Sequence, residues 1–226
     1  MNRIWHISDT HSYHELLKIP ENIDIVIHSG DCSNYRDPYK NEYEVRDFIH
    51  WFSSLPIKHK IFVAGNHDTS IEKRLIKRQD FDKKDIIYLE NNSVEINGLK
   101  IYGSPITPQF GDWSFMRSRS KICKIWDAIE NNTDVLVTHG PPKSILDSAY
   151  RSNSNAELAG CLNLFKKVHK LPDLKTHLFG HIHNSKDIKN QGFRRLPNLD
   201  VLFSNGSVVE DGRFGKLSTN GNIIDL

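Results

Sequence analysis

Five short apolar runs along the chain each lead into a polar residue of a type that binds metal ions. The runs cover residues 3–8, 24–28, 60–64, 134–138 and 176–179, and they lead to Asp9, Asp31, Asn66, His139 and His181. Runs this short and rich in Ile and Val predict strands that are buried on both faces. Ligands of an open α/β sheet bind beyond the carboxyl ends of its strands. We therefore expect these five side chains to converge on one site.

Helical patterns lie between several of these runs. We expect helices over residues 42–54, 121–131 and 156–170. A hairpin is expected where Asn97 and Gly98 separate two apolar stretches, because this pair favours a tight antiparallel turn. Strands that alternate with helices, together with a hairpin, predict an α/β sandwich with mixed sheets.

The composition is that of an ordinary globular domain, with 38% hydrophobic and 26% charged residues. No repeat or linker divides the 226 residues, so we expect a single domain, residues 1–226. The formal net charge of +2 gives no general attraction to nucleic acid or membranes, and no apolar run approaches the length of a membrane span. Three scattered cysteines without a CxxC pair are typical of a reducing compartment. We expect a cytoplasmic protein without a membrane or nucleic-acid partner, and nothing in the sequence sets its oligomeric state.

Seven residues in and after these runs offer ligand atoms for metal ions: Asp9, His11, Asp31, Asn66, His139, His181 and His183. Asp9 and His11 are two positions apart, a spacing that points both side chains the same way in extended backbone. His181 and His183 repeat this spacing. Oxygen and imidazole ligands without thiolates suit Mn²⁺, and also Fe or Zn²⁺. Seven ligands exceed the needs of one tetrahedral site and fit two divalent ions that share the Asp31 carboxylate.

The order of these motifs resembles that of the calcineurin-like metallophosphoesterases. Their pattern of D-x-H, GD, GNH followed by an acidic residue, a single His and GHxH is complete between residues 9 and 183. The sequence is most similar to the small branch called metallophosphoesterase-domain-containing proteins, through residues 55–56, 102–105, 126–127 and 138–142. It departs from that branch at Asp68, where Glu is common, and at Ile106, where Trp is common.

The resemblance implies a four-layer α/β/β/α sandwich with two mixed β-sheets. The implied ligands of one metal ion are Asp9, His11 and His183, and those of the other are Asn66, His139 and His181, with Asp31 shared. His67 would be a catalytic residue that stabilises the phosphoryl oxygens or protonates the leaving group, and Asp68 would orient it. The alternative role of Asp68 is to cap a helix that follows it.

The resemblance also implies hydrolysis of a small phosphoester substrate by a hydroxide that bridges the two ions. The expected substrate is a phosphodiester, such as a cyclic nucleotide or a similar small diester. A phosphomonoesterase is the alternative enzyme. A non-catalytic metal-binding scaffold is a further alternative, although such proteins typically lose ligand or catalytic residues and this sequence keeps them. A nuclease is disfavoured because the sequence has no basic stripe.

Residues 109–115 contain three aromatic side chains in a stretch that we expect to form a loop. One interpretation is that the aromatic side chains pin this loop to the core. The other is that these aromatic side chains, Phe110, Trp113 and Phe115, form a wall on which a nucleobase or another flat group stacks, with Trp113 and Phe115 as the candidate substrate-binding residues. Residues 148–155 suggest a second contribution to the site, from Tyr150 and Arg151.

Overall fold

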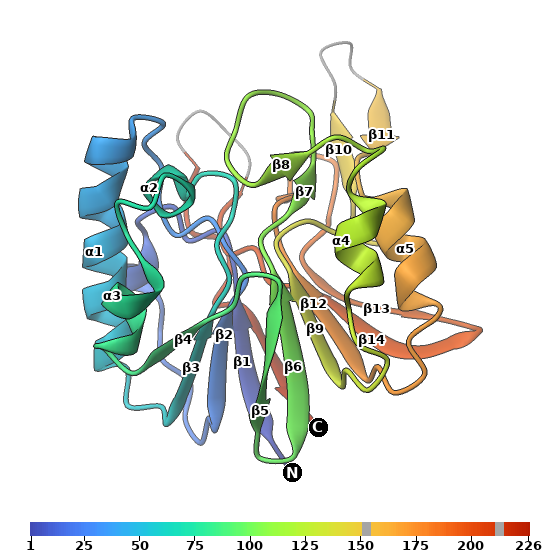
Figure 1. The fold of residues 1–226 in the computed structure, drawn as a ribbon, viewed down its shortest axis with the longest axis horizontal. Helices are drawn as coiled ribbons and strands as arrows, with labels where there is room; N and C mark the ends of the chain where they lie inside the picture. Colours follow the sequence, from blue (N-terminus) through green and yellow to red (C-terminus); the bar gives the residue numbers. More distant parts are fainter. Residues whose placement is uncertain (151–154, 211–214) are drawn as a thin grey trace.

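Two mixed β-sheets pack face to face in the computed structural model, which describes residues 1–150, 155–210 and 215–226 (Figure 1). The first sheet has the strand order β15-β1-β2-β3-β4. Its strands are β1 (Arg3–Ile7), β2 (Ile25–His28), β3 (His59–Phe62), β4 (Ile86–Tyr88) and β15 (Asn222–Asp225). β1 to β4 run parallel to one another, and β15 pairs antiparallel with β1 at the edge.

The second sheet has the order β13-β14-β12-β9-β6-β5. Its strands are β5 (Asn92–Ile96), β6 (Leu99–Ser104), β9 (Val135–Thr138), β12 (Thr176–Phe179), β13 (Gly192–Leu196) and β14 (Leu199–Asn205). The four inner strands are parallel, and an antiparallel strand closes each edge. The predicted hairpin is confirmed as β5–β6. Asn97 and Gly98 have φ values of 50° and 77°, and a two-residue type I′ turn requires positive φ at both positions.

Helices cover the outer face of each sheet, so the predicted layer order α/β/β/α is confirmed (Figure 1). The helices over the first sheet are α1 (Pro38–Ser54), α2 (Thr69–Glu72) and α3 (Arg78–Asp82), and those over the second are α4 (Cys123–Asp127) and α5 (Leu162–Val168). A 3₁₀ turn, η1 (His14–Leu16), follows β1. The Asp37 carboxylate caps α1 by accepting hydrogen bonds from the backbone N–H groups of Tyr39 and Lys40. None of the helices in the described part of the chain has the length and apolar character to cross a membrane.

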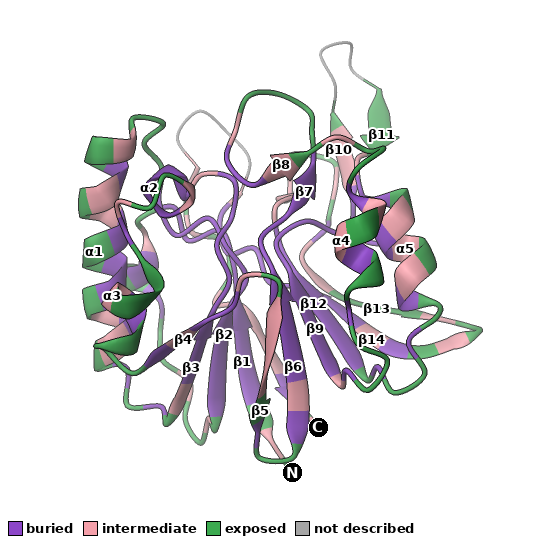
Figure 2. Cartoon of the chain, viewed as in Figure 1, coloured by how far each residue is buried: buried purple, intermediate pink, exposed green. Residues whose placement is uncertain are grey.

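The central strands are buried on both faces, as their sequences predict (Figure 2). Ile4, Ile27 and Val137 belong to the core between the two sheets. Phe62 points the other way and contacts Phe48 of α1, with ring centroids 5.1 Å apart. Because side chains alternate between the two faces of a strand, a strand between two apolar layers must be apolar throughout. The buried faces thus account for the unbroken apolar runs.

Two small strand pairs lie near the carboxyl ends of the second sheet (Figure 1). β7 (Thr107–Pro108) pairs with β8 (Met116–Arg117), and β10 (Ser148–Tyr150) pairs with β11 (Ala156–Leu158). The prediction of one helix over residues 156–170 is therefore wrong in its first part, and only α5 remains helical. Gly160 interrupts the pattern: its N–H donates to the Asp147 carboxylate at 2.9 Å, and glycine is unfavourable inside a helix. The helix predicted over residues 121–131 is also shorter than expected: α4 covers only Cys123–Asp127.

Candidate metal centre

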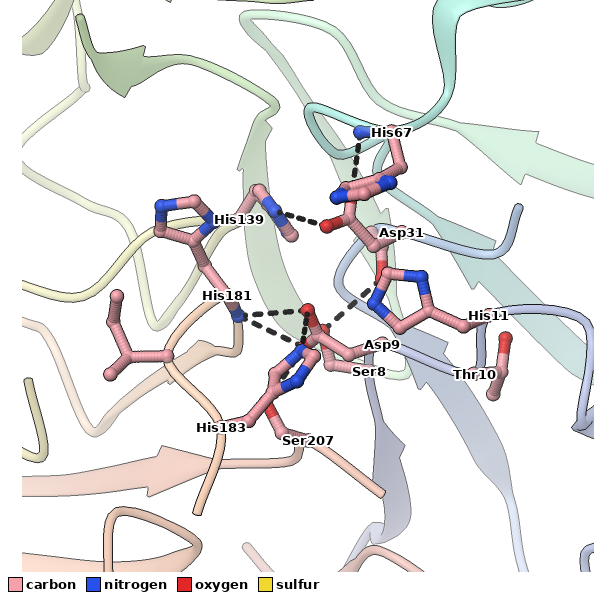
Figure 3. A network of polar contacts seen from close by, with 12 residues as sticks. Ser8, Asp9, Thr10, His11, Asp31, His67, His139, His181, His183 and Ser207 are labelled. Carbon is pink, nitrogen blue, oxygen red and sulfur yellow. Dashed lines mark hydrogen bonds and ion pairs between the residues drawn. The ribbon is translucent and has the colours of Figure 1, made fainter. Parts of the chain in front are cut away.

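The polar residues that follow the five central strands gather at one edge of the two sheets (Figure 3). The loops after β1, β2 and β3 come from the first sheet, and those after β9 and β12 come from the second. Hydrogen bonds join the two sides. The His181 N–H donates to the Asp9 carboxylate at 2.9 Å, and the Ser207 hydroxyl donates to the same carboxylate at 2.7 Å. The structure therefore brings the strand ends of both sheets together.

One group of possible metal ligands consists of Asp9, His11 and His183, whose ligand atoms lie within 4.8 Å of one another. The His183 Nε2 is 3.1 Å from the Asp9 Oδ1. The His11 Nδ1 lies 3.1 Å from the Ser33 carbonyl oxygen, which can only accept, so Nδ1 carries the proton and Nε2 is left for a metal ion. These three residues are the ones that the family resemblance assigns to one ion.

A second group consists of Asp31, His139 and His181, whose ligand atoms also lie within 4.8 Å of one another. The His139 Nε2 lies 3.2 Å from the Asp31 Oδ2 and 2.9 Å from the Asn66 Oδ1, so Asn66 joins this group. The His139 Nδ1 is 2.9 Å from the Ser29 carbonyl oxygen, and this bond directs Nε2 toward the other ligands. The residues expected at the second ion are therefore neighbours, with Asp31 among them.

Four of these residues have a left-handed backbone, with φ of 53° at Asp9, 42° at His11, 58° at Asp31 and 70° at His181. Such values are uncommon outside glycine and concentrate at functional sites. We predicted that an extended backbone would bring Asp9 and His11 together. In the structure, a sharp turn of the chain after β1 brings them together instead. Gly180 packs so closely against this turn that a Cβ atom there would collide with the Asp9 carboxylate.

Both aspartates of the two groups are buried, and no Lys or Arg side chain of the described residues pairs with either carboxylate. Burial alone would raise the pKa of each carboxyl. Instead, His183 holds the pKa of Asp9 well below its usual range, and His139 does the same for Asp31. Although burial opposes it, Asp31 in turn raises the pKa of His139 to about 9. Imidazoles therefore provide the positive charge that balances the buried carboxylates in the protein alone.

The chemistry of these donors fits divalent metal ions. Burial lowers the pKa of His11 to about 4 and that of His181 to about 3, so both rings are neutral at neutral pH and offer lone pairs. The two buried carboxylates need a positive partner, and a divalent cation can take the place of the proton that balances them on His139 in the protein alone. Asn66 adds an amide oxygen, and neither group contains a thiolate. This combination of oxygen and nitrogen ligands suits Mn²⁺, Fe or Zn²⁺.

His67 contacts a residue of each group (Figure 3). Its backbone N–H donates to the Asp31 Oδ1 at 2.7 Å, and its ring centroid lies 4.8 Å from that of His11. The His67 Nδ1 is buried and has no hydrogen-bond partner within the described residues. The ring packs instead on Trp113, with centroids 4.4 Å apart, and the Arg36 guanidinium lies 4.3 Å from the centre of the same indole. Aromatic packing, and not a hydrogen bond to the side chain, therefore sets the plane of the His67 ring.

Asp68 joins the loops of the site and does not contact the His67 ring. Its carboxylate accepts hydrogen bonds from the Gly65 N–H at 2.7 Å, the Asp31 N–H at 3.0 Å and the Ser33 hydroxyl at 2.7 Å. It makes no side-chain cap to α2 either. The orienting role and the capping role predicted for Asp68 are both corrected, because the turn at Gly65 directs the carboxylate under the Asp31 loop.

The structure separates the aromatic residues of the 109–115 loop. Phe115, predicted to contact the substrate, is 1% exposed and belongs to the core, so this prediction is wrong. Trp113 reaches the site, where it packs on His67. Phe110, which the sequence placed among the aromatic residues of the possible stacking wall, is 57% exposed, and its ring lies 5.4 Å from that of His181. Spacing along an irregular loop gave no signal that could distinguish the inward from the outward ring. Arg151 lies outside the described residues.

A family model described as calcineurin-like phosphoesterase matches residues 2–185, a range that contains all seven candidate ligands and His67. The chain belongs to the calcineurin-like phosphoesterase family. The resemblance inferred from its motifs is therefore confirmed. Phosphoesterases of this family use divalent metal ions, and the two ligand groups are the candidate positions for such ions in this chain.

Three similar proteins place this phosphoesterase within its family. Metallophosphoesterase domain-containing protein 1 of Homo sapiens is 31% identical over 222 residues, which cover 88% of this chain and 66% of that protein. UPF0046 protein C25E10.12 of Caenorhabditis elegans is 37% identical over 202 residues, with coverage of 82% and 70%. A 3′,5′-cyclic-nucleotide phosphodiesterase of Nostoc sp. is 29% identical over 204 residues, with coverage of 85% and 67%. The chain thus spans just under two thirds of the length of the human relative.

Proposed function

We propose that this phosphoesterase hydrolyses phosphodiesters, and that its substrate is a cyclic nucleotide or a similar small diester. The main support is the pair of adjacent ligand groups, both of which His67 contacts. The name of the Nostoc relative, a 3′,5′-cyclic-nucleotide phosphodiesterase, supports the diester class.

Within this proposal, Asp9, His11 and His183 would hold one divalent ion, Asn66, His139 and His181 would hold the other, and Asp31 would serve both. When bound, the ions polarise the phosphoryl group and activate water for attack. Mn²⁺ is the expected ion, because Mg²⁺ prefers oxygen ligands and tolerates an imidazole-rich site poorly. A chelator should therefore abolish activity, and Mn²⁺ should restore it more readily than Mg²⁺.

His67 is the residue that we assign to the leaving group. Its ring lies beside His11 of one ligand group, its backbone N–H donates to Asp31 of the other, and its buried Nδ1 makes no hydrogen bond within the described residues. The ring can therefore stabilise charge on a phosphoryl oxygen or donate a proton to the departing alkoxide. Trp113 has a positioning role in this scheme, because it packs on His67 while Arg36 packs on its indole. The Arg36 guanidinium is held in turn by the Asp112 carbonyl oxygen at 2.6 Å.

The proposed preference for a diester rests on the lack of a further positively charged side chain, beyond the metal ions, at the described residues of the site. Two divalent ions attract monoester dianions as well as diester monoanions, so the metal charge does not separate the two classes. A dianion would gain more from an additional Arg clamp, and such a clamp gives strong bidentate hydrogen bonds. Among the described residues, no Lys or Arg side chain makes a hydrogen bond or ion pair with Asp9, Asp31 or His67. The absence of such a pair at these three residues, within the described part of the chain, supports the diester class.

The direct test compares kcat/KM for bis(4-nitrophenyl) phosphate and 4-nitrophenyl phosphate with the Mn²⁺-loaded protein. We expect the diester to be the better substrate. Asp31→Asn, prepared identically, reports any activity from contaminating enzymes. A tenfold preference for the monoester, about 1.4 kcal/mol at the transition state, would show that the enzyme is a phosphomonoesterase. No activity on either ester with saturating metal would indicate a scaffold.

A further inference from the structure

A pocket of about 310 Å³ opens directly beside His181. Its walls come from three separate segments: the loop that contains Phe110, the turn after β9 at Gly140 and Pro141, and the β10–β11 hairpin. The Phe110 ring, on one wall, lies 5.4 Å from the His181 ring. The pocket therefore adjoins the second ligand group without containing its other members.

The rim of this pocket exposes an unusual amount of apolar surface. Phe110 is 57% exposed, Tyr150 is 45% exposed and Leu158 is 47% exposed, and all three line the pocket. Such large side chains, gathered around one hollow, mark a ligand site more often than isolated apolar residues do. Arg119 adds one guanidinium to the lining, with donors that suit a carbonyl or ring nitrogen acceptor.

We propose that this pocket binds the organic ester group of the substrate, and that this group is flat and of the size of a nucleobase or nucleoside. The proposal rests on the proposed diesterase function and names the part of the diester that the metal groups do not hold. Phe110 and Tyr150 offer aromatic faces on which a base stacks, a contact that tolerates different bases. The volume lies at the lower end of the range for small-molecule sites, which favours a single nucleotide over a polymer.

The position of the pocket supports this occupant over a protein partner. A phosphorus atom bound between the ligand groups would carry its ester oxygens within reach of the pocket, because His181 belongs both to the second group and to the pocket lining. A diester keeps one organic group after the leaving group departs, so a pocket next to the metal groups can hold the retained part. A monoester keeps no such group once its alcohol has left.

Two substrates with the same charge and the same leaving group test the proposal. They are thymidine 5′-(4-nitrophenyl phosphate) and methyl 4-nitrophenyl phosphate, which differ only in the retained ester group. We expect Phe110→Ala to lower kcat/KM for the thymidine diester by about tenfold, since stacking on one aromatic ring contributes about this much per base. Leu158→Ala should also lower this value, because it removes apolar surface that the base would cover. Both variants should change kcat/KM for the methyl diester by less than twofold. Ala159→Phe, which fills the pocket, should have the same selective effect. Phe193→Ala, at an equally exposed position (48%) on β13, is the matched control and should change neither rate.

A binding measurement makes the test independent of turnover. Calorimetry with thymidine 5′-monophosphate and with inorganic phosphate should show that the pocket variants lower the affinity for the nucleotide and leave the affinity for phosphate unchanged. Equal loss on both diesters, or no loss on either, would overturn the pocket assignment while leaving the diesterase function intact. If the wild type instead prefers 4-nitrophenyl phosphate to both diesters, the proposed function itself fails. If the wild type hydrolyses both diesters at the same rate and the variants match it, the pocket serves another occupant, such as a protein partner.

Discussion

The metal centre and the neighbouring pocket are built in different ways. Each candidate ligand lies in a loop directly after a buried strand. Backbone carbonyl oxygens orient the rings of His11 and His139, and the His181 backbone N–H donates to the Asp9 carboxylate. The pocket is bounded by loops and a short hairpin, and Phe110 and Leu158 on its walls are largely exposed. Strand ends in a packed sandwich hold a constellation of ligands rigidly, whereas loops can vary without disturbing the core. Under the two proposals made above, the strand ends carry the reaction and the loops select the substrate.

Replacing the shared carboxylate should have the largest effect. We expect Asp31→Asn to reduce kcat/KM by about 10³-fold on every phosphoester, because one neutral amide replaces the negative charge common to both groups. Metal content, measured by elemental analysis after dialysis, should fall at both positions. Asp200→Asn, which changes an exposed carboxylate on β14, is the matched control. A variant that loses activity on the thymidine diester alone would break the division between metal centre and pocket.

Two histidine variants separate a ligand from a catalytic residue. His139→Gln should lose metal, because Nε2 faces Asp31 and Asn66. His67→Gln should keep near-normal metal content but lose about 10²-fold in turnover on substrates with poor leaving groups, where protonation of the alkoxide matters most. Metal analysis and rates on a series of leaving groups check both variants. Loss of metal from His67→Gln would mean that His67 is a ligand.

Trp113 lies in the same loop as Phe110 of the pocket, but its ring packs on His67. We expect Trp113→Ala to lower the rate on poor leaving groups by about tenfold and to have little further effect in the His67→Gln background. Trp113→Phe should restore most of the lost rate. A double-mutant cycle with both leaving-group classes measures this coupling. If the Trp113→Ala loss persists in the His67→Gln background and grows with nucleoside diesters, Trp113 contacts the substrate.

The pH dependence of stability should show the smallest effect, and only in the metal-free protein. The pKa of His139 is about 9 in the folded chain, above its ordinary value of 6.5. Its stabilising contribution is therefore fully present below about pH 6.5 and is lost as the pH rises through 9. Urea unfolding with a chelator present should show the free energy of unfolding falling across this window. His139→Gln should flatten the curve, and a slope identical to the wild type would contradict the assignment.

The sequence predicted the metal centre better than its surroundings, for a physical reason. The apolar runs, the strand ends and the Asn97-Gly98 turn depend on local pattern, and the structure confirms the strands and the hairpin. β11 was predicted as helix because its pairing with β10 depends on a contact outside its own sequence. The inward turn of Phe115 and the contact of Trp113 with His67 likewise result from tertiary packing of an irregular loop. The left-handed backbone at the ligands also gave no sequence signal, because Asp and His are not restricted to that region.

Counting the metal ions bound per chain tests the central claim most directly. The protein would be stripped with a chelator and titrated with Mn²⁺ in a calorimeter, while hydrolysis of bis(4-nitrophenyl) phosphate is followed on parallel samples. Two neighbouring groups of ligands predict two equivalents of Mn²⁺ per chain at saturation, and the proposed sharing of Asp31 predicts that activity rises as the second equivalent binds. Saturation and full activity at one equivalent would contradict the two-ion site.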